Sequence, residues 1–391
     1  MKVLFVLNTT VMGGGNISFI NMLKGLHAKG MECYIVSPDR EVEATFQEMA
    51  KDYVQKFYYA PLVSYFYAEP RYLSGLRKLK AYARIAVYCN PFIRKYRADR
   101  ELSYMDKIVA EVKPDIIHTN VGVIHVGHVA AKKWHIPHVW HLREYQTKDF
   151  HCMIAPSYDK FVEMLHEDYV ITITKDILQY FKLTDNPKAQ YIYNGCFFKA
   201  DVTLTLPKSK YLLCCSRVAE EKGHRDVIDA FAVFHKKYPE YKLVIAGFGD
   251  DQFISELRVS AEQKGCSEAV DFIGYRKDVR PLMNKAQALI VASRCEGFGR
   301  MTAEAAFCGC LVVGHNTGGT KEILDVTGGF PYEGGAEMLE QKMEEIAALS
   351  DKEYRLMAEK AQQEAVVHFS NEAYVDGVYS LYKKIMDAKR N

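Results

Sequence analysis

The sequence has no hydrophobic run that approaches the length of a membrane span. A transmembrane helix needs roughly 20 mostly apolar residues, and charged or polar residues interrupt every apolar stretch of this chain well before that length. The chain opens on a strand-like run, Val3 to Leu7, without the basic start, apolar core and small-residue cleavage site of a signal peptide. We therefore expect a cytoplasmic protein.

Cysteine pairs with the spacing of a zinc site are also absent. The ten cysteines are scattered, and no two have C-x2-C spacing. Cys214 and Cys215 lie inside an apolar run, where free thiols behave as small hydrophobic side chains. This usage suits a reducing compartment better than a disulfide scaffold.

The chain has no large excess of charge of either sign. Its 51 Lys and Arg residues nearly balance 49 Asp and Glu, for a net charge of +2. The overall charge thus gives no reason to expect a nucleic-acid partner. With 391 residues, of which 49% are hydrophobic and 26% charged, the chain has the composition of a globular protein and room for two domains.

Short β-branched runs alternate with helical patterns through most of the sequence. We expect strands at residues 3–7, 32–37, 115–119, 138–141, 169–174 and 190–193, and again at 211–216, 242–246, 270–273, 288–292 and 310–314. Helical patterns include 17–28 and 123–134. Such alternation is typical of doubly wound parallel sheets, so the fold class is α/β with two Rossmann-like domains.

The join between the two domains falls in a polar, proline-containing stretch at residues 196–209, just after Asn194-Gly195. The first domain is expected at residues 1–200 and the second at 205–370. A last helical segment, 371–391, is expected to pack back on the first domain.

Residues 71–100 depart from the alternation because they are strongly basic. They hold nine Lys and Arg residues against a single acid, Asp99, so their net charge is +8 and that of the rest of the chain −6. Apolar residues such as Leu76, Leu79 and Phe92 are interleaved with the cations. A basic amphipathic segment can lie on an anionic membrane surface. A solvated basic face over ordinary core residues is the alternative, and the pattern leaves both open.

Two cations follow the first strand of the second half. Arg217 comes directly after Ser216, and Lys222 follows within Glu221-Lys222-Gly223. Ligands of open α/β sheets bind beyond the carboxyl ends of the strands. Arg217 and Lys222 can supply the positive charge that a diphosphate needs without a metal ion. The alternative is a pair of surface cations near a loop.

Two carboxylates flank a glycine turn after the strand at 288–292. Glu296 precedes Gly297-Phe298-Gly299, and Glu304 lies about one turn into a predicted helix. The glycines allow close backbone approach, and free N–H groups at a helix start can face phosphate. Because carboxylates accept hydrogen bonds from vicinal hydroxyls, the arrangement matches a sugar–diphosphate–ribose ligand. The alternative is a glycine turn between ordinary surface glutamates.

Taken in order, these motifs resemble the retaining glycosyltransferases of family four, also known as glycosyl transferases group 1. The resemblance rests on Ser216-Arg217 with Glu221-Lys222-Gly223, on Glu296-Gly297-Phe298-Gly299 with its seven-residue spacing to Glu304, and on glycine-containing matches at 13–15, 194–195, 246–250, 273–275 and 318–322. It implies the GT-B fold, in which two Rossmann-like domains face a central cleft.

The resemblance also assigns roles in the second domain. Arg217 and Lys222 would bind the donor diphosphate, Glu296 the transferred sugar and Glu304 the ribose. Further donor contacts are expected at Gly249, Tyr275, Phe298, Gly299, Arg300 and Met301, with Tyr275 near the base and 298–301 near the distal phosphate or sugar. No metal or other cofactor is expected.

In the first domain, Gly14 and Gly15 resemble the family's glycine loop, which closes on the donor phosphate. Asn16 stands where many relatives have alanine, and it is expected to contact the acceptor together with Arg143 and Glu144. His141, expected to be exposed at a strand end, matches the family's histidine near the transferred sugar. The expected catalytic set is therefore His141, Arg217, Lys222 and Glu296.

Six histidines crowd residues 118–141, and His-x2-His occurs at 125/128 and at 138/141. This spacing is compatible with metal ligation. However, the first pair falls in a helical pattern and the second in an extended one, and no cysteine accompanies them. We expect no metal site here.

The function implied is transfer of a sugar from a nucleoside-diphosphate sugar to an acceptor hydroxyl with retained configuration. The resemblance implies that the leaving phosphate receives the acceptor proton, which matters here because no carboxylate nucleophile stands out in the first-domain loops. The acceptor is expected to be a glycan or a lipid-linked molecule of cell-surface assembly, reached at the inner face of the membrane. A nucleotide-sugar epimerase, which would need no acceptor, and a degenerate donor-binding subunit are the alternatives.

Overall fold

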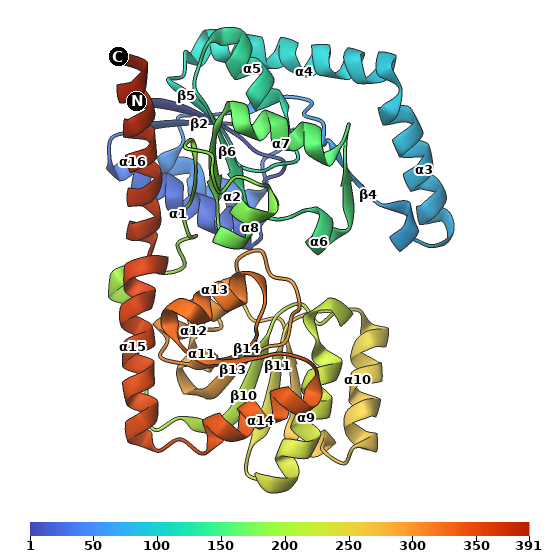
Figure 1. The fold of residues 1–391 in the computed structure, drawn as a ribbon, viewed down its shortest axis with the longest axis vertical. Coiled ribbons are helices and arrows are strands. Elements are labelled where there is room, and N and C mark those ends of the chain that lie inside the picture. Colours follow the sequence, from blue (N-terminus) through green and yellow to red (C-terminus); the bar gives the residue numbers. More distant parts are fainter. Residues whose placement is uncertain (391) are drawn as a thin grey trace. The chain divides into compact units, whose positions relative to one another are not determined.

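The computed structural model describes residues 1–390, apart from the side chains at positions 88 and 89. The chain divides into two compact units. Unit 1 combines Met1–Gly195 with the residues from Tyr374 onward, and unit 2 is Cys196–Ala373. Each unit has its own parallel sheet with helices packed around it (Figure 1).

The sheet of unit 1 has seven strands in the order β3-β2-β1-β5-β6-β8-β9. They are β1 (Lys2–Val6), β2 (Glu32–Ser37), β3 (Lys56–Tyr59), β5 (Ile116–Thr119), β6 (His138–Leu142), β8 (Tyr169–Thr172) and β9 (Ala189–Tyr191). All neighbouring strands pair in parallel. A separate antiparallel pair joins β4 (Phe66–Ala68) to β7 (Cys152–Ile154).

The strands expected in the first half are all present, whereas β3, β4 and β7 were missed. β3 is a short edge strand, KFYY, whose side chains are all at least partly exposed. It therefore lacks the alternation between buried and exposed positions by which a strand is recognised in a sequence.

The helices of unit 1 are α1 (Gly14–Ala28), α2 (Ala44–Ala50), α3 (Gly75–Cys89), α4 (Pro91–Val112), α5 (Val126–Trp134), α6 (Thr147–Phe150), α7 (Tyr158–Glu167), α8 (Lys175–Tyr180) and most of α16 (Asn371–Arg390), with 3-10 turns η1 (Lys51–Tyr53) and η2 (Pro70–Tyr72). α1 begins three residues before the predicted start, at the glycines themselves.

The last helix, α16, is part of the core of unit 1. Tyr374, Val378 and Tyr382 are buried in the same apolar cluster as residues of β1 and α1. A Cβ atom at Gly25 of α1 would lie 2.3 Å from Cγ2 of Val375, so the two helices touch at a position that only glycine allows.

The sheet of unit 2 has six parallel strands in the order β12-β11-β10-β13-β14-β15. They are β10 (Ser209–Cys215), β11 (Lys242–Ala246), β12 (Val270–Gly274), β13 (Ala286–Val291), β14 (Leu311–His315) and β15 (Phe330–Tyr332). In this sheet the first strand, β10, is followed on one side by β11 and then β12. The next strand in the sequence, β13, lies on the other side of β10. Such a change of direction marks the place where open α/β sheets bind ligands.

The helices of unit 2 are α9 (His224–Lys237), α10 (Asp251–Gln263), α11 (Arg280–Lys285), α12 (Arg300–Phe307), α13 (Gly318–Thr327), α14 (Ala336–Ala347) and α15 (Asp351–Phe369), with 3-10 turns η3 (Lys199–Asp201), η4 (Glu220–Lys222) and η5 (Ser267–Ala269). Buried side chains such as Leu212, Phe231 and Ile290 form its main core.

The basic segment at 71–100 forms α3 and the first half of α4, which meet at Asn90 near the outer edge of unit 1 (Figure 1). Within the described side chains of α3, only Ala81 is buried. Large apolar side chains project into solvent, among them Leu76 at 74% exposure and Phe92 at 83%. Across residues 1–390, no helix combines the length and the hydrophobicity that crossing a bilayer requires.

Glu101 of α4 is a buried carboxyl group with an incomplete set of partners. One of its oxygens accepts the backbone N–H of Val63, but Oε1 has no hydrogen-bond partner. Burial raises the pKa of Glu101 to about 8, against the lowering effect of Val63 and Arg97. Because an unfolded glutamate ionises near pH 4.3, folding takes up a proton at this site between about pH 4.3 and 8.

We expect Glu101→Gln to stabilise unit 1 at pH 8 and to have little effect near pH 5. The native protein loses stability at this site as pH rises, because a proton must be bound on folding, whereas glutamine needs none. The advantage of the variant is expected to grow by roughly 3–4 kcal/mol between pH 5 and pH 8, measured by thermal unfolding at both pH values. The exposed Glu163→Gln variant is the control for the loss of one charge, and an equal effect of Glu101→Gln at pH 5 and 8 would contradict the prediction.

Candidate functional site

The residues predicted to bind the donor gather at one edge of the unit 2 sheet. Arg217 and Lys222 follow β10, and Glu296 and Glu304 follow β13. β10 and β13 are parallel neighbours, with Leu212 opposite Ala288. Their following loops therefore lie side by side at the change of direction in the strand order.

Lys222 and Glu296 form an ion pair across these two loops. Nζ of Lys222 donates to Oε1 of Glu296 at 2.6 Å, and both side chains are partly buried. The approach depends on Gly223, which has φ +73° and whose Cβ, if present, would lie 2.5 Å from the carbonyl oxygen of Ala292. Only glycine therefore lets η4 rest against the end of β13.

Arg217 is also paired, but in a more exposed position. Its Nη2 donates to Oε1 of Glu221, which the sequence analysis treated only as a neighbour of Lys222. Each predicted cation thus has a carboxylate partner in the structure. An anionic ligand at this edge competes with Glu221 for Arg217 and with Glu296 for Lys222.

Gly249 supports the backbone that carries Arg217. A Cβ at Gly249 would lie 2.1 Å from the carbonyl oxygen of Val218, and the N–H of Val218 donates to the carbonyl of Phe248 at 2.8 Å. The loop after β11 therefore packs directly on the loop after β10. Gly249, predicted to contact the donor, therefore lies where the backbone of the loop after β11 contacts the backbone of the loop after β10.

Two exposed aromatic rings lie beside this edge. Phe248 follows β11 and Tyr275 follows β12; they are 62% and 64% exposed, with ring centroids 6.2 Å apart. Exposed rings of this size suit stacking with a planar ligand group. Tyr275 was predicted to lie near the base, whereas Phe248 was not predicted, although an aromatic residue between two glycines at a strand end was the available signal.

The glycine turn after β13 is held by α13. Gly299 has φ +82° and precedes the first residue of α12, Arg300. A Cβ at Gly319 would lie 2.1 Å from the carbonyl oxygen of Phe298, and the N–H of Gly319 donates to the carbonyl of Glu296 at 2.8 Å. The ring of Phe298 is buried and Met301 packs against an apolar cluster, so these two residues can offer a ligand mainly their backbone.

Glu304 and Arg300 form a second ion pair, one turn apart on α12. Nε of Arg300 donates to Oε1 of Glu304, and both side chains are largely buried. Burial raises the pKa of Glu304, while Arg300 opposes the rise. The two residues predicted as separate donor contacts thus act on each other in the absence of a ligand.

In unit 1, Gly14 and Gly15 form the amino end of α1. Asn16, predicted to contact the acceptor, donates from Nδ2 to the carbonyl oxygens of Thr9 at 3.2 Å and Val11 at 2.8 Å. Its amide nitrogen therefore fixes the loop between β1 and α1. A Cβ at Gly15 would lie 3.8 Å from Cδ of Arg143, which brings the glycine loop close to that arginine.

Arg143 is 8% exposed and forms hydrogen bonds only with neutral groups among the described residues, although its charge also lowers the pKa of the neighbouring Glu144. Nε and Nη2 donate to Oδ1 of Asn120 at 3.0 and 2.8 Å, Nη1 donates to Oδ1 of Asn194 at 2.8 Å, and Nη2 donates to the hydroxyl of Tyr374 at 2.8 Å. A buried charge without a counter-ion is costly. This position therefore suits an anionic group of a ligand.

His141 is fully buried, so its predicted exposure at the strand end is wrong. β6 is an interior strand, and α16 covers the histidine with the ring of Tyr374, 6.0 Å away between centroids. Nδ1 of His141 lies 3.2 Å from Nε2 of His118, whose Nδ1 lies 2.5 Å from the hydroxyl of Tyr382. Burial and then Arg143 hold the pKa of both histidines well below the ordinary value, so both rings are neutral at pH 7.

Glu144, the other residue predicted on the acceptor side, follows Arg143 in the loop after β6. Gln146 donates from Nε2 to its Oε2 at 2.5 Å. Burial, and then the negative charge of Asp149, raise the pKa of Glu144 to about 7. Its carboxyl group therefore holds its proton to a higher pH than an exposed glutamate does.

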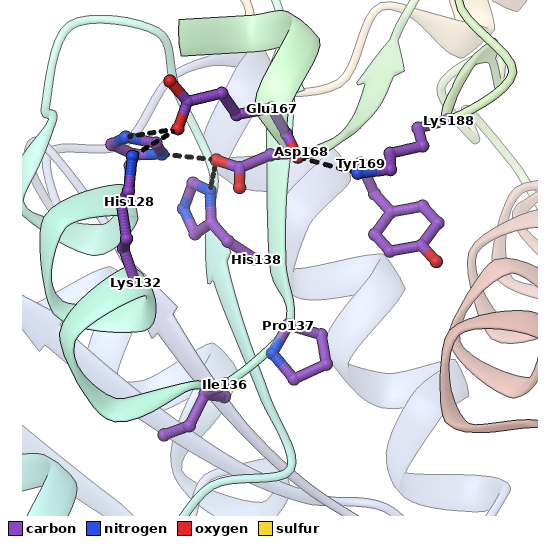
Figure 2. A pocket seen from close by; sticks show the side chains of 9 residues that line it. All are labelled: His128, Lys132, Ile136, Pro137, His138, Glu167, Asp168, Tyr169 and Lys188. Carbon is purple, nitrogen blue, oxygen red and sulfur yellow. Dashed lines mark hydrogen bonds and ion pairs between the residues drawn. The ribbon is translucent and has the colours of Figure 1, made fainter. Parts of the chain in front are cut away.

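The histidine-rich region contains a cluster that sequence spacing did not indicate. His128 and His138 both place Nδ1 2.7 Å from Oδ2 of Asp168 (Figure 2). The His-x2-His spacing in the sequence had paired His125 with His128 and His138 with His141. In the structure His125 stacks on Tyr65, with centroids 4.3 Å apart, and Asp168, missed in the sequence, joins the other two.

One ring nitrogen of His128, one of His138 and one carboxylate oxygen of Asp168 lie within 4.8 Å of one another, which is close enough for all three to bind one metal ion. At 2.7 Å, however, each contact is a hydrogen bond to one carboxylate oxygen. Nε2 of His138 is also bonded, at 2.8 Å to Thr119. Lys132 and Lys188 line the same pocket together with Glu167, which pairs with Lys132 at 2.8 Å (Figure 2). The cluster is best explained as a polar link between α5, β6 and the start of β8.

We expect Gly223→Ala to destabilise unit 2 by about 1–3 kcal/mol more than Gly265→Ala, because only the first adds a steric clash. Both glycines have φ +73°, but a Cβ at Gly265 would meet nothing within 4 Å. Thermal or denaturant unfolding of the two variants measures the difference. Equal losses of stability would show that the contact between Gly223 and Ala292 is not needed.

Comparison with known proteins gives a consistent result over both units. The family model for glycosyltransferase family 4 matches residues 12–196, and the model for glycosyl transferases group 1 matches residues 199–365. Among characterised relatives, poly(glycerol-phosphate) alpha-glucosyltransferase of Bacillus subtilis is 26% identical over 67% of this chain and 38% of its own length. Alpha-monoglucosyldiacylglycerol synthase of Acholeplasma laidlawii is 24% identical over 68% of this chain and 67% of its own. The chain thus aligns with little more than a third of the Bacillus protein.

Solved structures share the fold of the whole chain. Anabaena HepE in complex with UDP has a TM-score of 0.73 and 19% identity over 100% of both chains. A glycosyltransferase from Rickettsia africae has a TM-score of 0.77 and 20% identity over 98% of each chain. The predicted GT-B architecture of two Rossmann-like units is confirmed. The chain belongs to the glycosyl transferases of group 1, in family 4.

Proposed function

We propose that this protein is a hexosyltransferase that moves a sugar from a nucleoside-diphosphate donor to an acceptor hydroxyl with retained configuration. The observation that carries the proposal is the pairing of Lys222 with Glu296 where the strand order of unit 2 changes direction. A cation and a carboxylate at this edge provide both groups that a sugar diphosphate needs. Structures of HepE in complex with UDP and with UDP and glucose support a donor of this class.

Donor binding rearranges the ion pairs of this edge. The diphosphate takes Arg217 from Glu221 and Lys222 from Glu296, which replaces two internal ion pairs by charge-assisted bonds to phosphate. Glu296 is then free to accept hydrogen bonds from sugar hydroxyls. Phe248 and Tyr275 offer rings for the base, and Glu304 offers a carboxyl group for the ribose.

Transfer gains from fixed positive charge at the leaving group. The diphosphate becomes more negative as the glycosidic bond breaks, and preorganised cations stabilise that charge most strongly in the transition state. Lys222 and Arg217 fill this role without a metal ion. The leaving phosphate accepts the proton of the attacking hydroxyl, which retains the configuration when attack occurs on the same face.

The partners of Arg143 indicate the chemical class of the acceptor. Its buried guanidinium has no carboxylate partner among the described residues, so an anionic group is its natural ligand. The Bacillus relative is named for an anionic polymer, poly(glycerol-phosphate). We infer an acceptor that carries a phosphate group, consistent with a role in cell-surface polysaccharide or glycolipid assembly.

We also propose that α3 and the start of α4 bind an anionic membrane surface. Leu76, Leu79 and Phe92 are exposed. The four cations of α3 form no ion pair within the described part of the chain: Arg77, Lys78, Lys80 and Arg84. Exposed apolar side chains among unpaired cations match a bilayer interface, where each cation contributes about 1 kcal/mol. This surface would bring the enzyme to lipid-linked acceptors.

We expect Lys222→Ala to lower kcat/KM for transfer by about 10²–10³-fold while leaving the fold intact, because the variant loses charge at the leaving diphosphate. A screen of nucleotide sugars, read by released nucleoside diphosphate and mass analysis of the product, first identifies the donor. Lys352→Ala, an exposed lysine on α15, is the control. Unchanged transfer by Lys222→Ala would rule out the assignment, and product formed without acceptor would indicate an epimerase.

We expect the triple variant Arg77→Gln, Lys78→Gln, Lys80→Gln to bind vesicles with about 30% anionic lipid at least tenfold more weakly than the native protein. The double variant Leu76→Ser, Leu79→Ser should lose a similar amount. The control for the triple variant carries three matched changes on α15: Lys352→Gln, Arg355→Gln and Lys360→Gln. The control for the double variant carries two: Leu356→Ser and Val367→Ser. Vesicle sedimentation measures binding, and equal binding to neutral and anionic vesicles would refute the membrane proposal.

A further inference from the structure

A cavity of about 290 Å³ in unit 1 lies beside the polar link formed by His128, His138 and Asp168 (Figure 2). His128 comes from α5, His138 is the first residue of β6, and Asp168 directly precedes β8. Their side chains are largely buried, with exposed fractions of 8%, 1% and 15%. The link therefore forms one wall of a cavity that has room for a small ligand.

The atoms that form this link are also suited to bind a metal ion. Nδ1 of each histidine lies 2.7 Å from Oδ2 of Asp168, and the three residues place one possible ligand atom each within 4.8 Å of one another. Ligand atoms about 2.0–2.2 Å from one tetrahedral ion are separated by roughly 3.3–3.6 Å. The hydrogen-bonded atoms therefore need to move apart by less than about 1 Å to hold an ion.

The second nitrogen of each ring faces an oxygen that can accept a proton when Nδ1 binds a metal. Nε2 of His138 lies 2.8 Å from Oγ1 of Thr119, and Nε2 of His128 lies 3.9 Å from Oε2 of Glu167 (Figure 2). Metal-bound histidines usually donate their other N–H to such an oxygen, which fixes the tautomer and the orientation of the ring. A Cβ at Gly127 would lie 2.1 Å from Oγ1 of Thr119, so α5 packs closely on this contact.

Exchange of the two hydrogen bonds for metal bonds leaves the number of protons on neutral rings unchanged. In the metal-free link each Nδ1 carries the proton, because the ionised carboxylate of Asp168 can only accept. When the metal binds, each proton moves to Nε2 and points to Thr119 or Glu167. The hydroxyl of Thr119 then accepts from His138 and no longer donates to it. Three metal bonds outweigh the loss of that one bond.

The charges around the cavity are compatible with an ion of charge +2. Asp168 supplies one negative charge to the ion, and Glu167 supplies a second beside His128. Lys132 lies 2.8 Å from Glu167, and Lys188 donates to the backbone carbonyl of Glu167 at 2.9 Å. Both lysines are exposed, so solvent and salt screen their repulsion of a bound ion.

We propose that His128, His138 and Asp168 bind one Zn²⁺ ion, with a water molecule in the cavity as the fourth ligand. Two imidazoles and one carboxylate suit Zn²⁺, whereas Mg²⁺ and Ca²⁺ prefer oxygen ligands alone. The His-x2-His spacing did not indicate this site because Asp168 lies 30 residues beyond His138.

The bound ion stabilises unit 1 and takes no part in transfer. It lies at the amino ends of β6 and β8, whereas Arg143 follows the carboxyl end of β6. The ion joins α5, β6 and the start of β8 more firmly than the hydrogen bonds do, because it binds the native unit and not the unfolded chain. The inference therefore stands independently of the proposed function.

Calorimetric titration of ZnCl₂ into chelator-treated, reduced protein measures the binding. We expect one site with a Kd below about 10 μM, and binding at least about tenfold weaker in His128→Gln and Asp168→Asn. The matched control is His166→Gln, an exposed histidine two residues before Asp168, which should bind zinc as the native protein does. Absence of binding by the native protein, or equal binding by all four proteins, would overturn the proposal.

X-ray absorption of the zinc-loaded protein identifies the ligands directly. We expect nitrogen and oxygen ligands that include two imidazoles. A sulfur ligand would place the ion at one of the free cysteines and refute the assignment.

Thermal unfolding tests the effect on stability. Free Zn²⁺ at about a hundred times Kd should raise the Tm of the native protein by about 5–10 °C, and His128→Gln should abolish the increase. An unchanged Tm of the native protein would contradict the stabilising role. If Asp168→Asn does not fold, His128→Gln decides the outcome, because glutamine keeps an amide N–H for Asp168.

Discussion

Three contacts between backbone segments, each possible only at glycine, hold together the edge of the unit 2 sheet where Lys222 pairs with Glu296. Gly223 rests on Ala292, Gly249 on Val218, and Gly319 on Phe298. Each contact ties the loop after one strand to the loop after its neighbour or to the next helix. The side chains that carry charge therefore start from a rigid base, and Lys222 can reach Glu296 without a mobile loop. Preorganisation of this kind lowers the cost of binding and of charge stabilisation.

The polar side chains described in the two units have different kinds of partners. In unit 2 the cations and carboxylates of the edge are paired with each other, at the surface or partly buried. In unit 1 the polar groups near His141 and Arg143 are buried and bonded to neutral partners, two of which are tyrosines of α16. The edge of unit 2 can exchange one anion for another, whereas the polar groups of unit 1 stay in fixed positions.

Much of the fold could be predicted from the sequence, because buried parallel strands and amphipathic helices leave local patterns. The gathering of Arg217, Lys222, Glu296 and Glu304 at one edge of the unit 2 sheet could be predicted because each residue follows a strand of the same parallel sheet. β3 was missed since an exposed edge strand has no such pattern. His141 was assigned to the right strand with the wrong burial, because its cover, α16, lies more than 200 residues away in the sequence. The partners of Arg217, Arg143 and Asp168 depend on three-dimensional contacts that no spacing encodes.

The discontinuity of unit 1 has a consequence for protein synthesis. Its sheet is complete by Tyr191, but Tyr374, Val378 and Tyr382 belong to its core and are translated only after the whole of unit 2. A nascent chain therefore carries an unfilled apolar face on β1 and α1 while unit 2 emerges from the ribosome. The buried residues of α16 close that face, so the polar groups around His141 and Arg143 reach their final arrangement only after unit 2 has been translated.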